Sequence, residues 1–583
     1  MQFLQSKYTA FFVVILSLIY HTFFFQYNTI LTEADSFSYI RMAEGLLRLS
    51  SDGFGNGWFG FIYSVFLAPF LVVFGSGILA GQIANIFLLV ISAYLFYSLA
   101  QKMFSTNWSL FALVLFLFHP SFLYYRIHLL AENIYIPIFL ALVLAVWKYV
   151  EILKSQKDGD DRRYYLREEE KIHTWKYYIY PLILWALLWF LYLTRAEGFI
   201  YMWSIGLIAW VLLIQKYLSF QQFLRAGGIF FISFFIFISP YLIHLHNLTG
   251  EWWLTNKWAS NWRQAELRGR EHMDDLGFEE AVAGLTDDNT QLIAGFAWGM
   301  PYTRPLIEWW FFNSLREDPL PHILRFWKNQ VKLYTQNIPE IYFGKSYTLY
   351  LSDDRRFHGI PFQVFLILLI LPLIAWIIIS YKKYPQFLWI FFVFFLPASI
   401  FFTLFFTLNR YFIIFLPFFV VFTTLWISHL QSCLKNTLWK YSYTLPLLFL
   451  VVFSANTTLS NYNFLNSERE KNAFYTLKKE AWVWIAENIE NTDELKILER
   501  FPFVTYYSWA RWRFITPYTE DISDIEAFMR YNDIDYLIID SMDYYTYRPA
   551  LRQYLEEFPH GFQLVQEFTN DTWKKVRIVE LKD

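Results

Sequence analysis

Two carboxylates lie close together just after the first long apolar segment of the chain. Glu33 and Asp35 belong to the stretch TEADSFSYIRMAEGLL, Thr32 to Leu47. Ionisable residues at the edge of a membrane are costly to keep there and usually serve a function. A carboxylate in such a place can accept the proton of an attacking hydroxyl. Tyr39 follows Asp35 by one helical turn and can help to shape the same pocket.

Three further charged clusters fall at predicted ends of apolar segments. They are Arg126 with His128 and Glu132, then Arg195 with Glu197, and Arg410 beside Tyr411. An arginine can hold a phosphate through a bidentate fork and stabilise the charge on a leaving phosphate. Together with a carboxylate base, such arginines suit the transfer of a group from a lipid phosphate. Single charged side chains at helix ends also often only reach toward the membrane surface or cap the helix. This structural interpretation fits any one of the clusters better than it fits all four together.

The composition is that of a membrane protein. Of the 583 residues, 56% are apolar and only 17% are charged, whereas soluble domains carry about 25% charged residues. Mean hydropathy is +0.30, and the many aromatic residues suit lipid-facing surface and interfacial belts. A net charge of −2 argues against a nucleic-acid partner. Because Cys433 is the one cysteine in the sequence, an intrachain disulfide and a cysteine-based metal cluster are excluded.

Eleven apolar runs approach the roughly 20 residues that cross a bilayer. They are Tyr8 to Phe25, Leu79 to Ala100, Trp108 to Tyr125, Asn133 to Val150, Tyr177 to Leu193, Phe199 to Leu213, Gly227 to Leu245, Ile360 to Ile379, Phe387 to Thr407, Tyr411 to Leu430 and Tyr441 to Leu459. We interpret the first as a retained signal-anchor helix, since no small-residue cleavage site follows it. A twelfth run, Phe59 to Phe74, is shorter and contains Pro69, which favours a re-entrant or interfacial helix. The sequence thus predicts a polytopic α-helical membrane protein with about 11 transmembrane helices.

Lysine and arginine are concentrated in alternate loops, such as Lys102, the segment from Lys154 to Lys176, and Lys382 with Lys383. The positive-inside rule places these loops and the N-terminus in the cytoplasm. An odd number of spans then places the C-terminus outside. On this topology the four charged clusters share the outer face of the membrane.

The chain is predicted to form two domains. Residues 1–460 make a transmembrane domain with a first outer loop at 26–78 and a large outer loop at 247–359; loops of that length are usually functional. Residues 461–583 have a soluble composition and predict a small α/β extracytoplasmic domain. We expect helices at Lys471–Ile489, Asp524–Tyr531 and Arg548–Glu557, strands at Lys496–Glu499, Phe514–Thr516 and Tyr536–Asp540, and a hairpin of Phe562–Phe568 with Lys575–Leu581.

Five segments carry a resemblance to a known family. They are TEADSFSY, GWFGFIYSVFLAPFLVVFG, HPSFLYYRIHLLAENIYIPIFL, LTRAEGF and NRYFIIFLPFF. Each motif alone is loose, but their order and their shared predicted side resemble the integral-membrane type C glycosyltransferases (GT-C fold). Within that family the chain most resembles the branch of the protein O-mannosyltransferases and the lipid A aminoarabinose transferase. The resemblance extends over residues 1–460.

The resemblance implies a glycosyltransferase that moves a sugar, with inversion, from a polyprenyl-phosphate donor to an acceptor hydroxyl at the outer face of the membrane. Asp35 matches the family's first-loop catalytic aspartate and would be the general base. Glu132 falls at the second acidic position. Glu33 would assist, although Ala34 separates it from Asp35 where the related mannosyltransferases have adjacent acids.

The substrate-binding residues that the resemblance implies are Arg410 and Tyr411, which match the family's arginine-tyrosine pair near the lipid phosphate, and Arg195, Glu197, Arg126, His128 and Tyr39. The partners would be the lipid-linked donor, membrane lipids, and an acceptor that is a protein, a lipid or a glycan. A bacterial inner membrane, with the site facing the periplasm, is the expected location.

A divalent cation is compatible with the paired acids, but no cofactor is required by the sequence. His128 and Glu132 are four residues apart and can share one helical face. No third ligand accompanies them, so a hydrogen-bonded pair is the better interpretation. Gly55, Gly57 and Gly60 match GxGxxG, but no strand precedes them, and the match does not indicate a dinucleotide site.

Two other function classes are compatible with a polytopic chain. A transporter or channel would place ionisable residues near the middle of its spans and use paired broken helices. A non-catalytic envelope-assembly protein would use the C-terminal domain to bind a partner. The charges at predicted helix ends and the large outer loop favour the enzyme.

Overall fold

The structure is a computed structural model of the whole chain. It describes residues 2–249, 252, 316, 319–338, 341 and 384–582, apart from gaps at 32, 56–59, 76, 161–169, 406–408, 438–443, 493, 500–503, 505–511, 515–521, 542–560 and 571–573. The predicted span Ile360 to Ile379, the predicted helix Arg548–Glu557 and most of the large outer loop lie outside these residues.

The chain divides into two compact units. The first comprises Met1–Gln26, Met42–Thr255 and His322–Leu465, and the second comprises Tyr27–Arg41, Asn256–Pro321 and Asn466–Asp583. The stretch that contains Glu33 and Asp35 therefore belongs to the same unit as the C-terminal domain.

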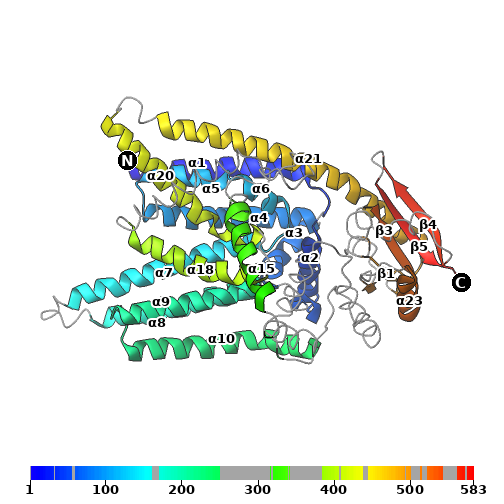
Figure 1. The fold of residues 1–583 in the computed structure, drawn as a ribbon, viewed down its shortest axis with the longest axis horizontal. Helices are drawn as coiled ribbons and strands as arrows, with labels where there is room; N and C mark the ends of the chain where they lie inside the picture. Colours follow the sequence, from blue (N-terminus) through cyan, green and yellow to red (C-terminus); the bar gives the residue numbers. More distant parts are fainter. Residues whose placement is uncertain are drawn as a thin grey trace. The chain divides into compact units, whose positions relative to one another are not determined.

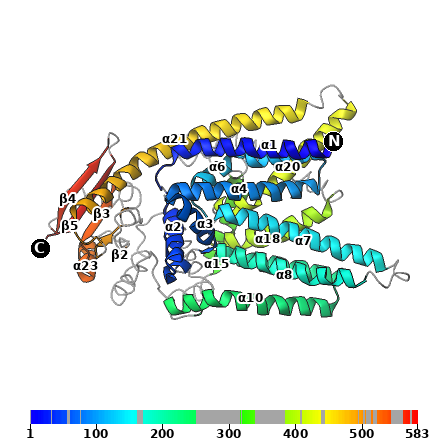
Figure 2. The same ribbon diagram turned by 180° about the vertical axis from the view of Figure 1, so that it is seen from behind.

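The first unit is a bundle of apolar helices (Figures 1 and 2). Its helices are α1 (Gln2–Phe23), α3 (Ile62–Phe74), α4 (Gly77–Gln101), α5 (Thr106–Leu117), α6 (Pro120–Ile127), α7 (Glu132–Asp160), α8 (Glu170–Thr194), α9 (Ile200–Ile214), α10 (Phe220–Thr249), α15 (Pro319–Lys332), α18 (Pro385–Phe405), α19 (Asn409–Phe412) and α20 (Leu416–Thr437), with short turns η1 (Phe24–Tyr27), η2 (Ser51–Phe54), η3 (Ala196–Phe199), η4 (Leu333–Asn337) and η6 (Ile413–Phe415). Like α15, whose first three residues belong to the second unit, α2 (Ala34–Leu47) and α21 (Thr444–Asn488) run from one unit into the other.

Eight helices in the described part of the chain are long and apolar enough to cross a membrane. The pair α5 and α6, which bends by 52° between Leu117 and Pro120, makes a ninth if it is counted as one span. The apolar part of α8, Ile179–Thr194, is shorter but lies where a span was predicted. The prediction of a polytopic α-helical membrane protein is confirmed. The 13 residues of α3 extend only about 20 Å, too short for a bilayer core of about 30 Å, which agrees with a re-entrant or interfacial helix.

The core of the first unit is built largely from phenylalanine. Phe139 on α7 lies 5.4 Å from Phe394 on α18 and 5.5 Å from Phe415 in η6, measured between ring centroids. All three side chains are fully buried. Edge-to-face packing of this kind adds to the burial of the rings themselves, and it brings the segment before α20 against α7.

The second unit contains a five-stranded sheet in the order β2-β1-β3-β5-β4. Its strands are β1 (Lys496–Leu498), β2 (Trp512–Phe514), β3 (Tyr536–Asp540), β4 (Phe562–Thr569) and β5 (Lys575–Leu581), and α23 (Ile522–Asn532) precedes β3. β1 is parallel to β2 and β3, whereas β5 is antiparallel to β3 and β4. The predicted α/β fold of this region is confirmed, with β2 starting two residues earlier than expected.

One feature of the secondary structure was not predicted. The predicted span Tyr441 to Leu459 and the predicted helix Lys471–Ile489 are parts of a single helix, α21, of 45 residues. No glycine or proline lies between Ser460 and Glu470, so nothing in the sequence ends the first helix before the second begins. At about 1.5 Å per residue α21 is about 68 Å long, so its C-terminal half must lie beyond a bilayer that its first half crosses.

Candidate active site

Three helix ends of the first unit bring their charges together. Glu132 is the first residue of α7, Arg195 directly follows α8, and Glu197 lies in η3 before α9. The Arg195 Nη1 donates to Glu132 Oε1, and its Nε and Nη2 donate to the two oxygens of Glu197, both at 3.4 Å. The three side chains are buried. Arg195 therefore serves two carboxylates with three of its N–H groups, an arrangement that only a guanidinium can make.

The signs of these charges match the helix ends on which they lie. Glu132 lies at the N-terminus of α7, where the helix dipole favours a negative charge, and Arg195 follows the C-terminus of α8, where it favours a positive one. Gly198 lets η3 fold back closely, since a Cβ there would lie 2.4 Å from the backbone carbon of Leu191. Gly60 is equally confined, because its Cβ would lie 2.4 Å from the Thr194 carbonyl oxygen.

Tyr411 joins this cluster to Arg410. The Arg195 guanidinium carbon lies 5.2 Å from the centre of the Tyr411 ring, and that of Arg410 lies 5.8 Å from the same ring. Phe402 stacks on the ring at 4.7 Å and 3°. Arg410 is half-buried, and both residues lie on α19, a four-residue helix between α18 and η6. We call Glu132, Arg195, Glu197, Arg410 and Tyr411 the ion cluster.

Two tyrosine hydroxyls adjoin the ion cluster. Tyr135 on α7 and Tyr201 on α9 are buried, their ring centroids are 6.5 Å apart, and both lie within electrostatic reach of Glu197 and Arg195. No motif or spacing singled them out among the 41 tyrosines of the sequence. Their hydroxyls add polar groups beside the charged ones.

Arg126 is held within the protein interior. It is fully buried, its Nη1 donates to Asn133 Oδ1 at 2.8 Å and to the Asn85 carbonyl at 3.5 Å, and its guanidinium carbon lies 5.2 Å from the centre of the Phe122 ring. His128 is also buried, between the rings of Tyr124 and Phe464 at 4.8 and 6.4 Å. Both residues were predicted to bind substrate.

Two asparagines hold the turn that leads into Glu132. The Asn133 Nδ2 donates to the carbonyls of Tyr125 (2.6 Å), Leu130 (3.1 Å) and His128 (3.2 Å). The Asn85 Nδ2 donates to the carbonyls of Arg126 (3.1 Å) and His128 (2.9 Å). The turn leaves carbonyls without helical partners inside the bundle, and the two amides satisfy them. We call Asn85, Asn133 and Arg126 the amide clamp.

The amide clamp extends to the short helix α3. The Tyr63 hydroxyl donates to Asn85 Oδ1 at 2.7 Å, and the Gln82 Nε2 donates to the Ile127 carbonyl at 3.3 Å. Asn85 and Asn133 were not among the residues predicted from the sequence. Amides inside apolar spans are themselves a sign of helix-to-helix hydrogen bonds, so this sign was present but was not used.

In the second unit, Glu33 precedes α2 and Asp35 lies in its first turn. The Glu33 carbonyl accepts a hydrogen bond from the Ser36 N–H at 3.0 Å. Both acids are partly exposed, whereas Tyr39 is buried. Lys471 on α21 lies 3.6 Å from the Glu33 carboxylate and 2.9 Å from that of Glu468.

Lys471 lies in the half of α21 beyond the membrane span. Burial by itself lowers the pKa of Lys471, but the carboxylates of Glu468 and Glu33 raise it by more, so its pKa is raised from the ordinary value of 10.5. The ammonium group is therefore charged at neutral pH.

No group of three or more metal-ligating side chains occurs among the described residues. Glu132 hydrogen-bonds to Arg195 rather than to His128, contrary to the predicted His128–Glu132 pair. Arg195 engages one oxygen of Glu132 and both oxygens of Glu197.

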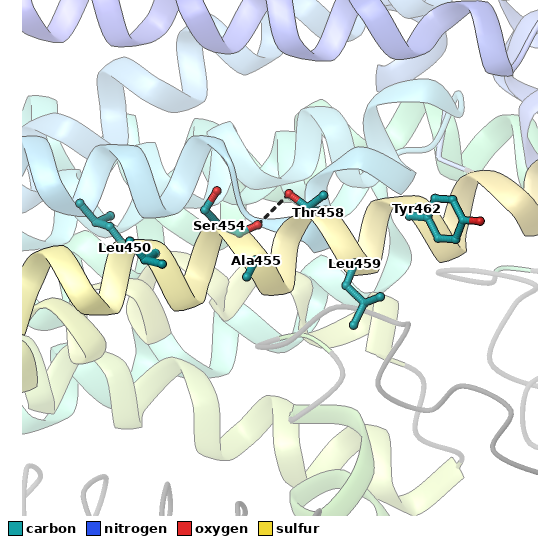
Figure 3. A pocket seen from close by; sticks show the side chains of 7 residues that line it. Leu450, Ser454, Ala455, Thr458, Leu459 and Tyr462 are labelled. Atoms are coloured by element: carbon teal, nitrogen blue, oxygen red, sulfur yellow. Dashed lines mark hydrogen bonds between the residues drawn. The ribbon is translucent and has the colours of Figure 1, made fainter.

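An apolar pocket of about 760 Å³ lies along one side of α21. Figure 3 shows Leu450, Ser454, Ala455, Thr458, Leu459 and Tyr462 on its wall, with the Thr458 hydroxyl donating to the Ser454 carbonyl at 2.9 Å. The described lining contains none of the charged residues above. Its chemistry suits a hydrocarbon chain and not a sugar.

Comparison with known proteins places this geometry in a fold. No family model matches the sequence, and no curated protein matches it. Among solved structures, the archaeal oligosaccharyltransferase AglB from Archaeoglobus fulgidus, in complex with an inhibitory peptide and a dolichol-phosphate, superposes with a TM-score of 0.54 at 13% identity, over 98% of this chain and 74% of that one. The apo form of the same oligosaccharyltransferase superposes with a TM-score of 0.54 at 12% identity, over 97% and 75% of the two chains.

The chain has the type C glycosyltransferase fold. The match to ArnT from Cupriavidus metallidurans, bound to undecaprenyl phosphate, covers 99% of this chain and 98% of the ArnT chain at 9% identity. Its TM-score of 0.49 is too low to support an argument by itself. The GT-C fold, together with the apolar helices, makes the chain an integral membrane protein and confirms the resemblance inferred from the five segments.

Proposed function

We propose that the protein transfers a sugar, with inversion, from a polyprenyl-phosphate-linked donor to an acceptor hydroxyl at the outer face of a bacterial inner membrane. The observation that carries this proposal is the ion cluster, which a GT-C fold assembles from three segments far apart in sequence. The AglB structure, which has the same fold, holds a dolichol-phosphate and a peptide. A lipid-linked donor and a separate acceptor suit a membrane body with charges at its helix ends.

In the proposed reaction the acceptor oxygen attacks the anomeric carbon of the sugar from the face opposite the phosphate. The new carbon–oxygen bond forms as the bond from that carbon to the phosphate oxygen breaks, which inverts the configuration. Asp35 accepts the proton of the acceptor hydroxyl. The electron pair of the broken bond leaves with the polyprenyl phosphate, and Arg410 beside Tyr411 stabilises the added negative charge.

The other residues of the ion cluster have a supporting part in this proposal. Arg195 is engaged by two carboxylates, so it orients Glu132 and Glu197 toward the substrate more readily than it binds a phosphate itself. Arg126 and His128 are buried in the turn before α7, and we assign them to holding Glu132 in place. Tyr39 remains proposed as a neighbour that shapes the acceptor pocket around Asp35.

The decisive experiment is Asp35→Asn in membranes supplied with a radiolabelled polyprenyl-phosphate sugar. Loss of a general base lowers the rate by about 10²- to 10⁴-fold, so labelled acceptor and free polyprenyl phosphate should both fall to background. Asp533→Asn is the matched control, because that side chain is 89% exposed. Equal melting temperatures of the two variants show that the fold is intact, and full transfer by Asp35→Asn would sink the assignment.

The same assay separates the other function classes. A transporter moves the labelled lipid or sugar across the membrane without releasing polyprenyl phosphate, and an assembly protein does neither. Release of the lipid phosphate together with labelled acceptor is expected only of a glycosyltransferase.

A further inference from the structure

Three contacts fasten the segment Tyr27–Glu33 to one part of α21. The Arg469 guanidinium carbon lies 5.5 Å from the centre of the Tyr27 ring, and the Asn472 Nδ2 donates to the Tyr27 carbonyl. The Lys471 ammonium pairs with the Glu33 carboxylate at 3.6 Å. All of these residues lie in the second unit. Two of the contacts hold the start of the segment, and the third holds its end, two residues before Asp35.

Lys471 also has a second partner, Glu468. It donates to Glu468 at 2.9 Å, three residues earlier on α21, and the Glu468 side chain is only 1% exposed. Residues three apart on a helix are neighbours. A buried carboxylate needs its partner, so Lys471 stays in place whether or not Glu33 binds it. The ammonium group is a fixed point on α21 to which Glu33 attaches.

The start of α2 separates the two acids in direction. A helix turns by about 100° per residue, so side chains two positions apart point to sides about 200° apart. The Ser36 N–H bond to the Glu33 carbonyl shows that this turn already begins at Glu33. The Glu33 carboxylate pairs with Lys471. Because Ala34 separates the two acids in sequence, the helical geometry places Asp35 on another side of the turn.

We propose that Glu33 is a positioning residue and not a catalytic one: its ion pair with Lys471 lets the C-terminal domain fix the place of Asp35. This inference rests on the proposed function, in which Asp35 is the base. It gives the C-terminal domain a part in catalysis, because α21 continues into that domain and ends eight residues before β1. It also makes Lys471, which no sequence motif indicated, a determinant of activity.

The test exchanges the two charges. Glu33→Gln and Lys471→Gln should each lower kcat by about 10- to 100-fold, because a small misplacement of a catalytic group costs up to about 10² in rate, while KM for the donor changes less than threefold. The exchange variant Glu33→Lys with Lys471→Glu also carries Glu468→Gln, so that no second carboxylate lies beside residue 471 on α21. It reverses the ion pair and should restore kcat to within about fivefold of wild type. Lys479→Gln, an exposed lysine two turns further along α21, is the matched control for loss of a lysine.

Two results would overturn the proposal. If the exchange variant is as inactive as Glu33→Gln although its melting temperature is normal, then the Glu33 carboxylate itself acts on the substrate. If Glu33→Gln keeps full activity, then the ion pair does not position the base. Lys471→Gln also removes the ammonium group that pairs with Glu468 and can therefore affect folding. Lys471→Arg keeps the positive charge, so it should fold and retain most of the activity. Failure of the proposed function can be told apart from failure of this proposal. The former appears as full activity of Asp35→Asn, independently of the result for the exchange variant.

Discussion

Replacing Arg195 with alanine tests whether the ion cluster is a stabilising and functional unit. The side chains of Glu132 and Glu197 are 2% and 3% exposed. Arg195 supplies the hydrogen bonds to both, two of them at 3.4 Å on Glu197. Without the guanidinium, two carboxylates remain where water scarcely reaches. We expect the variant to lose stability and transfer activity together.

The magnitude follows from what the stranded carboxylates can do. Breaking a buried ion pair by removing one partner costs about 3–5 kcal/mol. The carboxylates can avoid a buried charge by taking up a proton, which for an ordinary carboxyl at pH 7 costs about 3.7 kcal/mol. The loss should therefore be about 4 kcal/mol at pH 7. For a helical body of roughly 400 residues this corresponds to about 5 °C in Tm.

The pH dependence of the Tm shows whether buried carboxylates cause the loss of stability. In the variant the folded state binds more protons than the unfolded state, so its stability rises as the pH falls. Protonation at pH 5 costs only about 1 kcal/mol per carboxyl. The Tm difference from wild type should thus shrink by at least half between pH 7 and pH 5. A variant that merely lost packing would keep the same difference at both values.

The assay is thermal unfolding in detergent beside transfer in membranes. Lys148→Ala is the control on α7, since its pair with Glu151 at 3.3 Å involves a lysine that is 51% exposed, and such pairs contribute at most about 1 kcal/mol. The triple variant Arg195→Leu with Glu132→Gln and Glu197→Gln removes all three charges and should recover most of the Tm but none of the transfer. The reasoning is refuted if Arg195→Ala melts and transfers like wild type, or if the triple variant is less stable than the single one.

Two further predictions concern the amide clamp and the topology. Asn133→Ala removes three hydrogen bonds from the turn before Glu132 and also removes the acceptor of Arg126. We therefore expect kcat, measured at saturating donor, to fall at least tenfold with a smaller change in KM. A wild-type kcat would contradict a positioning role for the amide clamp. Cys433 is exposed near the end of α20 and is predicted to face the cytoplasm. A membrane-impermeant maleimide should therefore label Cys433 in inverted vesicles but not in intact spheroplasts. Labelling in intact spheroplasts would show that the predicted orientation is wrong.

The parts of the fold that depend on hydropathy were predictable. A run of about 20 apolar residues must form a helix in a bilayer, because no other conformation satisfies its backbone. The structure accordingly has helices at ten of the eleven predicted runs, and the eleventh, Ile360 to Ile379, lies outside the described residues. The strand Tyr536–Asp540 was predicted to the residue, since a short apolar run bounded by polar residues can do little else.

It was harder to predict from the sequence which side chains pair with one another. The sequence brought attention to Glu132, Arg195 and Arg410 because charges are conspicuous beside apolar runs, and the structure joins them through Tyr411. The sequence did not show that Arg195 would be shared by two acids, because that depends on how closely α8 and η3 approach at Gly198. Lys471 was one lysine among many until α21 proved to be continuous.

The position of the ion cluster along its helices bears on the choice between enzyme and transporter. α7 begins at Glu132 and continues for 29 residues, and α8 ends at Thr194 after 25; these lengths correspond to about 44 and 38 Å. α7 can therefore cross a bilayer core of about 30 Å entirely on one side of the cluster, while the apolar part of α8, Ile179–Thr194, ends at the cluster over a shorter length. A transporter site lies near the midplane, with half-helices on both sides. A charged cluster at the end of a full-length helix lies instead near one surface of the bilayer, and this placement favours chemistry at the membrane surface over passage through it.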